Sequence, residues 1–111
     1  MKDALIFIQH IIENVGNIES FSKDITKEEF SKDILRQNAI IRSIEVIGEA
    51  AKNLPSDFKK KHQTIPWKDI AGMRDKLIHN YFGVDLKIVW KVIKEDLPKL
   101  KKDIQGVLDK E

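Results

Sequence analysis

The sequence predicts an all-α fold, an up-and-down helical bundle of four to five helices in a single domain over residues 1–111. Apolar residues recur every three or four positions along nearly the whole chain, as one buried face of a helix requires. No stretch shows the strict alternation of a β-strand, and proline, glycine and capping residues stand where the periodic stretches end. With 111 residues, 41% of them hydrophobic and 34% charged, the chain can bury one core but is short for two domains.

The N-terminal half is predicted to form two helices. Apolar positions over Leu5–Ile18 mark the first, and a turn is expected at Ser20–Asp24. Thr26 and Glu29 have the spacing of a capping box, in which each side chain accepts a hydrogen bond from the other residue's backbone N–H. A helix is therefore expected to start here, and the apolar pattern carries it as one long helix to Leu54.

The middle of the chain contains two helix boundaries marked by proline. Pro55 is expected to end the long helix, and Ser56 to cap a short turn that carries Phe58. Pro66 suits the first turn of a further helix, whose apolar positions reach Ile78.

The last helix is predicted from its own start and stop signals. Gly83 is expected to close the preceding helix and Asp85 to cap the last one, which then runs to Leu108. Pro98 lies inside this stretch, so a kink or a restart is predicted near Asp96.

Composition restricts the possible functions. The 20 basic residues nearly cancel 18 acidic ones, so any contact with nucleic acid is expected to be local. The absence of cysteine excludes disulfides, thiolate metal sites and cysteine nucleophiles, and no cofactor or metal is expected. No apolar run has membrane-spanning length and residues 1–12 lack the features of a secretory signal, so we expect a cytoplasmic protein without membrane contact.

The segment from Arg74 to Tyr81 carries the strongest chemical signal. Arg74 can hold phosphate oxygens through its fork of donors, and His79 can accept or donate a proton near neutral pH. Asp75 lies four residues before His79 on the same helical face, where it could orient the imidazole. Tyr81 could bind phosphate or a sugar through its hydroxyl. Together these groups could cleave RNA without a metal, with the RNA's own 2′-hydroxyl as nucleophile.

Helical geometry complicates a site built from one chain. Five residues advance an ideal helix by about 500°, which leaves Arg74 and His79 roughly 140° apart around the axis. Either the helix unwinds before Asn80–Gly83, or two protomers contribute residues across a two-fold axis. We favour the dimer. Tyr81, seven residues after Arg74, shares a face with it and should flank the same groove.

Three blocks of the sequence resemble the HepT-like family of the HEPN superfamily. They are Arg36–Ala50, Ile65–Asp85 with the motif Arg74-x4-His79-x-Tyr81, and Trp90–Pro98, and they occur in the family's order. The resemblance implies a small helical homodimeric ribonuclease toxin. Endoribonuclease cleavage by attack of the RNA's own 2′-hydroxyl would leave a 2′,3′-cyclic phosphate end. The resemblance also implies a cognate minimal nucleotidyltransferase antitoxin that adenylylates the motif tyrosine, here Tyr81.

Other interpretations of the same residues remain open. Arg74 could be a surface or ion-pair residue, His79 could cap carbonyls at a helix end, and Asp75 could pair with a lysine. Tyr81 could be a half-buried aromatic. The protein could then be a non-catalytic helical dimer that serves as a binding or regulatory module for a nucleotidyltransferase, or an interaction protein whose motif is idle.

Further residues are expected to be mainly structural. Gly48–Ala51 reads as a close helix-packing patch, although Glu49 could border a cleft. The tryptophans Trp67 and Trp90 are expected to be core or interface anchors before they are stacking platforms. The basic run Lys59–His62 is expected to be a solvated turn.

Overall fold

The structure, a computed structural model, describes residues 2–77 and 83–111. These residues form helices joined by short connections, and no β-sheet is built from them. The helices are α1 Lys2–Ser22, α2 Lys27–Lys32, α3 Ile34–Lys52, α4 Ser56–Lys61, α5 Trp67–Ala71, α6 Met73–Leu77, α7 Leu86–Lys91, a π-helical turn Val92–Asp96 and α8 Leu97–Lys110. The predicted all-α class is confirmed.

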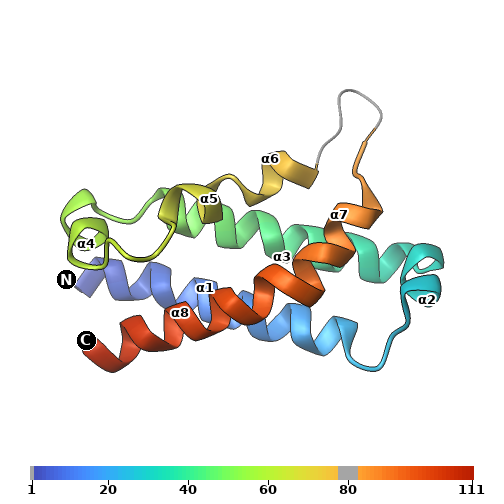
Figure 1. The fold of residues 1–111 in the computed structure, drawn as a ribbon, viewed down its shortest axis with the longest axis horizontal. Coiled ribbons are helices and arrows are strands. Elements are labelled where there is room, and N and C mark those ends of the chain that lie inside the picture. The colour runs from blue at the N-terminus through green and yellow to red at the C-terminus, as the bar shows by residue number, and fades with distance from the viewer. Residues whose placement is uncertain (1, 78–82) are drawn as a thin grey trace.

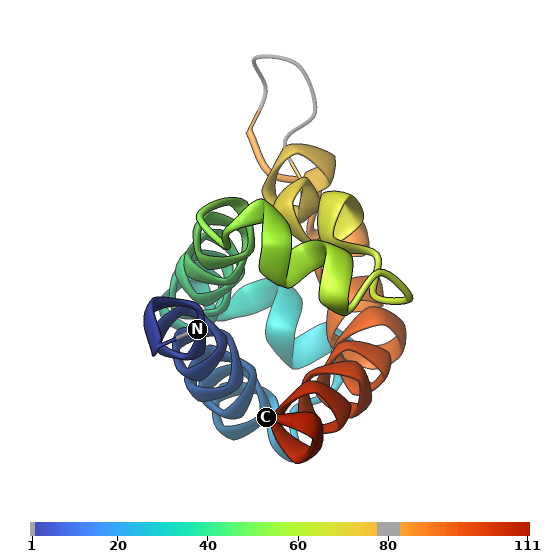
Figure 2. The same ribbon diagram turned by 90° about the vertical axis from the view of Figure 1, so that its left-hand side faces the viewer.

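The long elements run up and down around a common core. In Figure 1, α1 and α5–α6 run in one direction, while α3 and α7–α8 return in the other. The end-on view of Figure 2 places these four elements around the bundle, with α4 across the near end. The short helix α2 lies at the other end, so α2 and α4 close opposite ends of the bundle.

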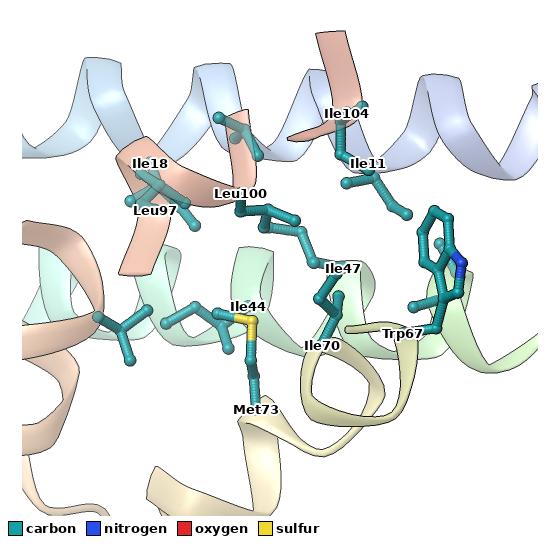
Figure 3. Packing of buried hydrophobic residues seen from close by; sticks show 14 of the residues in the cluster. Ile11, Ile18, Ile44, Ile47, Trp67, Ile70, Met73, Leu97, Leu100 and Ile104 are labelled. Atoms are coloured by element: carbon teal, nitrogen blue, oxygen red, sulfur yellow. The ribbon is translucent and has the colours of Figure 1, made fainter. Parts of the chain in front are cut away.

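The core is built almost entirely from aliphatic side chains at helical spacing. Figure 3 shows how residues from α1, α3, α5–α6 and α8 meet in it. Its fully buried members include Ile11 and Ile18 of α1, Ile44 and Ile47 of α3, and Ile104 of α8. Each of these side chains contributes about 1.5–3 kcal/mol by leaving water, which makes the amphipathic pattern the main determinant of the fold.

The capping box predicted at the start of α2 is confirmed. The Thr26 hydroxyl accepts from the Glu29 N–H at 3.1 Å, and the Glu29 carboxylate accepts from the Thr26 N–H at 3.0 Å. The backbone donor of Thr26 stabilises the charged carboxylate, and this lowers the pKa of Glu29. The turn before it is shorter than predicted, because α1 continues to Ser22 and Asp24 alone adopts a positive φ of 58°.

The prediction of a single helix from Thr26 to Leu54 is wrong, because the helix is interrupted at Asp33. Asp33 leaves the helical conformation, and its side chain accepts from the Arg36 N–H at 3.1 Å. A short polar side chain that binds a nearby backbone donor competes with helix continuation and starts a new helix instead. The result is a short α2 followed by α3.

The prediction that Ser56 caps a short helical turn is wrong in its capping residue. Pro55 occupies the N-cap position of α4, no side chain caps this end, and Ser56 is the first helical residue. Phe58, on this helix, is fully buried as an anchor. Pro66 likewise stands at the N-cap of α5 and not within its first turn.

The helix predicted to follow Pro66 is interrupted at Gly72, which separates α5 from α6. Glycine is a poor helix former, and here it marks a short discontinuity just before the motif. Trp67, in α5, is 6% exposed and donates from Nε1 to the His62 carbonyl at 3.1 Å, which confirms it as a core anchor.

The last predicted helix contains the expected irregularity before Pro98. Asp85 caps α7 by accepting from the Lys87 N–H at 2.9 Å, as predicted. A π-helical turn then ends at Asp96, where the Leu97 N–H donates to the Val92 carbonyl five residues back. Proline has no N–H for the regular ladder, and the wider turn lets α8 restart with Pro98 near its beginning.

One buried histidine joins α4 to the end of α8. The Glu111 carboxylate accepts from the Lys61 ammonium at 2.8 Å and lies 2.8 Å from Nε2 of His62, whose side chain is 3% exposed. Hydrogen bonds from Lys61 and then His62 lower the pKa of Glu111 below its ordinary value of 4.5. The ionised carboxylate is therefore the form that the fold stabilises.

We expect Glu111→Gln to destabilise the protein at pH 7 and to lose this effect in acid. Because the folded pKa is depressed, the contribution is present above the ordinary glutamate pKa of 4.5 and disappears as the pH falls through the folded value. Urea unfolding of both proteins at pH 7 and in acid measures the difference. Glu95→Gln, at an exposed residue that has no ion pair in the described structure, should show no such pH dependence. A difference that is constant with pH would contradict the assignment.

Within the described residues, no helix is both long and apolar enough to cross a membrane.

Candidate active site

Arg74 projects from the exposed side of α6. The neighbouring positions Met73 and Leu77 are buried and fix this helix against the core, so Arg74, Asp75 and Lys76 are turned toward solvent. The Arg74 Nε donates to the Glu45 carboxylate of α3 at 3.1 Å, and half of the arginine side chain is exposed. Arg74 is thus in an ion pair, as one open interpretation expected, yet it remains accessible.

The atom that makes this ion pair matters for chemistry. A guanidinium group has five N–H donors in one plane, and only the Nε donor contacts Glu45. The outer edge, with both terminal nitrogens, makes no other hydrogen bond or ion pair within the described structure. That edge has the geometry for bidentate binding of a phosphate.

Close packing of α3 against α5–α6 positions this pair. A Cβ at Gly48 would lie 3.1 Å from the backbone oxygen of Ala71, so only glycine allows this approach without displacement. Gly48, Ala50 and Ala51 are buried, which confirms the predicted small-residue packing patch. The patch brings α3 close enough for Glu45 to reach Arg74.

A small surface hollow of about 160 Å³ lies beside the pair. It is lined by Glu45, Gly48, Glu49, Lys52, Ala71, Arg74 and Asp75. Three of these side chains are acidic and two are basic, so the hollow has no excess of positive charge. The hollow offers an anion two cationic side chains, Arg74 and Lys52, and Glu49 does border it, as the sequence suggested.

The remaining motif residues lie outside the described structure. These are His79, predicted as the proton-transfer group, and Tyr81, predicted as a supporting and modified residue. The two described ends of the segment are joined, because the Asp85 N–H donates to the Leu77 carbonyl at 2.8 Å. Gly83 has a φ of +95°, a conformation that suits glycine, although the helix end it was predicted to close is not described.

Asp75 was predicted from the sequence as a site residue, whereas Glu45 is identified only by the structure. Asp75 is exposed on the wall of the hollow, but its predicted contact with His79 falls outside the described residues. Glu45 was not predicted. It lies 29 positions before Arg74, in a different helix, and carries no local motif. Only the packing of α3 on α6 identifies it.

No metal ligand set is evident in residues 2–77 and 83–111. Nowhere in them do three histidine, aspartate or glutamate side chains stand close enough to share a metal ion.

Comparison with known protein families shows to which family the chain belongs. The family model described as "Ribonuclease HepT-like" matches residues 11–107, which is most of the chain. The chain belongs to the HepT-like ribonuclease family. This confirms the resemblance found in the sequence blocks.

Curated relatives agree with this family. The "Probable ribonuclease HepT" of Thermococcus cleftensis is 52% identical over 95 residues, covering 86% of either chain. The "Putative RNase TTE0752" of Caldanaerobacter subterraneus subsp. tengcongensis is 46% identical over 111 residues, or 100% of this chain and 99% of the relative.

A third relative has a longer chain. The "Gamma-glutamylcyclotransferase and putative RNase MJ0434" of Methanocaldococcus jannaschii is 49% identical over 108 residues. The match covers 97% of this chain but only 49% of that protein, so the present chain spans about half of its length. No solved structure matches the HepT-like chain significantly.

Proposed function

We propose that this HepT-like protein is an endoribonuclease that cleaves RNA without a metal. Its family and the names of its relatives support ribonuclease activity. The observation that carries the proposal furthest is the accessible outer edge of Arg74, which Glu45 holds through Nε alone. An arginine anchored at Nε, whose terminal donors have no partner among residues 2–77 and 83–111, is prepared to bind a phosphate before the reaction begins.

In the proposed reaction, the 2′-oxygen of the RNA attacks the adjacent phosphorus. A bond forms between the 2′-oxygen and phosphorus, and the bond to the 5′-oxygen breaks, leaving a 2′,3′-cyclic phosphate and a 5′-hydroxyl. One proton leaves the 2′-hydroxyl and one is delivered to the 5′-oxygen; His79 serves as base or acid. Arg74 binds the non-bridging oxygens, whose charge grows in the transition state. Asp75 and Tyr81 have supporting roles, in orienting His79 and holding the substrate.

The proposal includes a partner and an assembly. Two copies form a homodimer that completes the site, and the protein acts as the toxin of a toxin–antitoxin pair. A cognate minimal nucleotidyltransferase adenylylates Tyr81, which places a bulky anion near Arg74 and blocks the cleft. This regulation rests on the motif at Tyr81 and on the family resemblance.

We expect the purified protein to cut single-stranded RNA in the presence of EDTA and to leave cyclic phosphate ends. The same strand with 2′-O-methyl groups should resist, because its 2′-oxygen cannot lose a proton. Product ends are identified by mass spectrometry. RNA that stays intact under all conditions, together with normal growth of cells that express the protein, would favour the alternative of a non-catalytic partner-binding module.

A further inference from the structure

A larger hollow lies away from Arg74, between α2 and the start of α7. Its volume is about 510 Å³, and its lining residues are Lys27, Glu28, Phe30, Ser31, Leu86, Lys87 and Trp90. The floor is aromatic: the rings of Phe30 and Trp90 are 5.5 Å apart at an angle of 37°. Phe30 is buried, but Trp90 is only half-buried, unlike the other tryptophan of the chain.

The rim of this hollow is basic. Lys27 and Lys87 line it, and neither forms an ion pair with a carboxylate of the described residues. The carboxylate at the rim, Glu28, is 3.3 Å from the ammonium of Lys32. Lys94 does not line the hollow, although its ammonium lies 4.8 Å from the centre of the Trp90 ring. The apolar floor is thus bordered by an excess of positive charge, although the whole chain carries only +2.

Part of the lining of this hollow follows the motif closely in the sequence. The hydrogen bond from the Asp85 N–H to the Leu77 carbonyl connects the start of α7 to α6, the helix that carries Arg74. Leu86 and Lys87, which line the hollow, directly follow Asp85. A strand with its scissile phosphate at the motif would therefore have its neighbouring nucleotides near this end of the bundle, where α2 and α7 lie (Figure 1).

We propose that this hollow binds an unpaired nucleotide of the RNA strand beside the cleavage site. The base packs against Trp90 on the apolar floor, and the adjoining phosphates contact Lys27 and Lys87. Aromatic stacking accepts any base, while the lysines supply attraction that depends on salt. The inference rests on the proposed function, since it takes RNA as the ligand.

Charge favours RNA over an apolar protein segment as the occupant. An apolar helix would fill the floor but would gain nothing from the ammonium groups of Lys27 and Lys87, which have no carboxylate partner in the part of the chain that the structure describes. A polyanion with flat, apolar bases matches both features at once. Selective recognition of one base is not expected, because the floor offers almost no polar groups.

Binding is tested with a fluorescein-labelled 2′-O-methyl single strand, which the protein cannot cleave. We expect Lys27→Glu with Lys87→Glu to weaken binding about tenfold or more at low salt and to reduce the salt slope by about two. The control double variant, Lys59→Glu with Lys60→Glu, makes the same charge change on α4, at the opposite end of the bundle (Figure 1). It should bind nearly as wild type. Equal loss in both variants would mean general charge attraction and would overturn the proposal.

Trp90 supplies a second readout that does not depend on a charge change. In Trp67→Phe, Trp90 is the remaining tryptophan, and its fluorescence should be quenched by adenine strands more than by uracil strands. Trp90→Leu should weaken binding while the fold, checked by thermal unfolding, persists. Unchanged fluorescence would overturn the proposal. So would variants at Lys27 and Lys87 that alter the oligomer mass without altering RNA affinity, since the hollow would then be a protein contact.

The two proposals can fail separately. A protein that cuts RNA but shows no effect at Lys27, Lys87 and Trp90 keeps the proposed function and loses the nucleotide site. A protein that binds the methylated strand through these residues but leaves ordinary RNA intact keeps the nucleotide site and loses the catalytic assignment.

Discussion

Arg74→Ala is expected to slow RNA cleavage by roughly 10²–10³-fold, as removal of one donor to a developing oxyanion does in other enzymes. The physical reason is the accessible edge of the guanidinium group, which would meet the phosphate when its charge is greatest. Because Arg74 is exposed and lies outside the core, thermal unfolding should change little. The rate is measured with a single defined RNA strand at saturating protein.

Matched variants separate the charge of Arg74 from its position. Arg74→Lys keeps a cation but loses both the planar fork and the Nε contact, so it should recover only part of the rate. Glu45→Gln keeps an oxygen that can accept from Nε, and should cost less than Glu45→Ala, with the loss in kcat and not in KM. Arg42→Ala, an exposed arginine of α3, is the control. If it slowed cleavage as much as Arg74→Ala, the role of Arg74 would be reduced to general binding.

Local signals in the sequence explain which helix boundaries could be predicted. The caps at Thr26 and Asp85 were found because the capping residue and its backbone partner are within three residues of each other. Asp33 and Arg36 are equally close in the sequence, but the prediction joined the capping box at Thr26 to the apolar pattern from Ile40 to Leu54 as one helix and did not consider a cap between them. Ile34 and Leu35, directly after Asp33, are 67% and 84% exposed, so no buried residue marks the start of α3.

The site residues, like the helix boundaries, could be predicted only where the signal is local in the sequence. The spacing of Arg74, His79 and Tyr81 is a property of one short segment, and the family model confirms the relationship it suggested. Glu45 and the α2–α7 hollow depend on contacts between helices far apart in the sequence. The ion pair of Glu45 with Arg74 depends on the close packing of α3 against α5 at Gly48, and the hollow depends on the path of the chain that brings α2 beside α7, so neither has a local pattern in the sequence.

His79→Ala is expected to lower the cleavage rate by about 10²–10⁴-fold, the usual contribution of a general acid or base. His10→Ala, an exposed histidine of α1, is the matched control and should cleave as wild type. Thermal unfolding of both variants checks that a loss of rate does not come from a loss of the fold. Wild-type cleavage by His79→Ala would remove this residue from the mechanism.

Mixing the two inactive proteins then tests whether the site joins two chains. On an ideal helix Arg74 and His79 point about 140° apart, so one phosphate can meet both if each comes from a different protomer. A mixed dimer of Arg74→Ala and His79→Ala would then have one intact site, with the arginine of one chain and the histidine of the other. Random exchange makes half of the dimers mixed, so activity should return to roughly a quarter of wild type. If both residues act within one chain, every site in the mixture lacks one of them. Persistent inactivity after subunit exchange has been verified would therefore place the site in a single protomer and require the helix to unwind before Asn80.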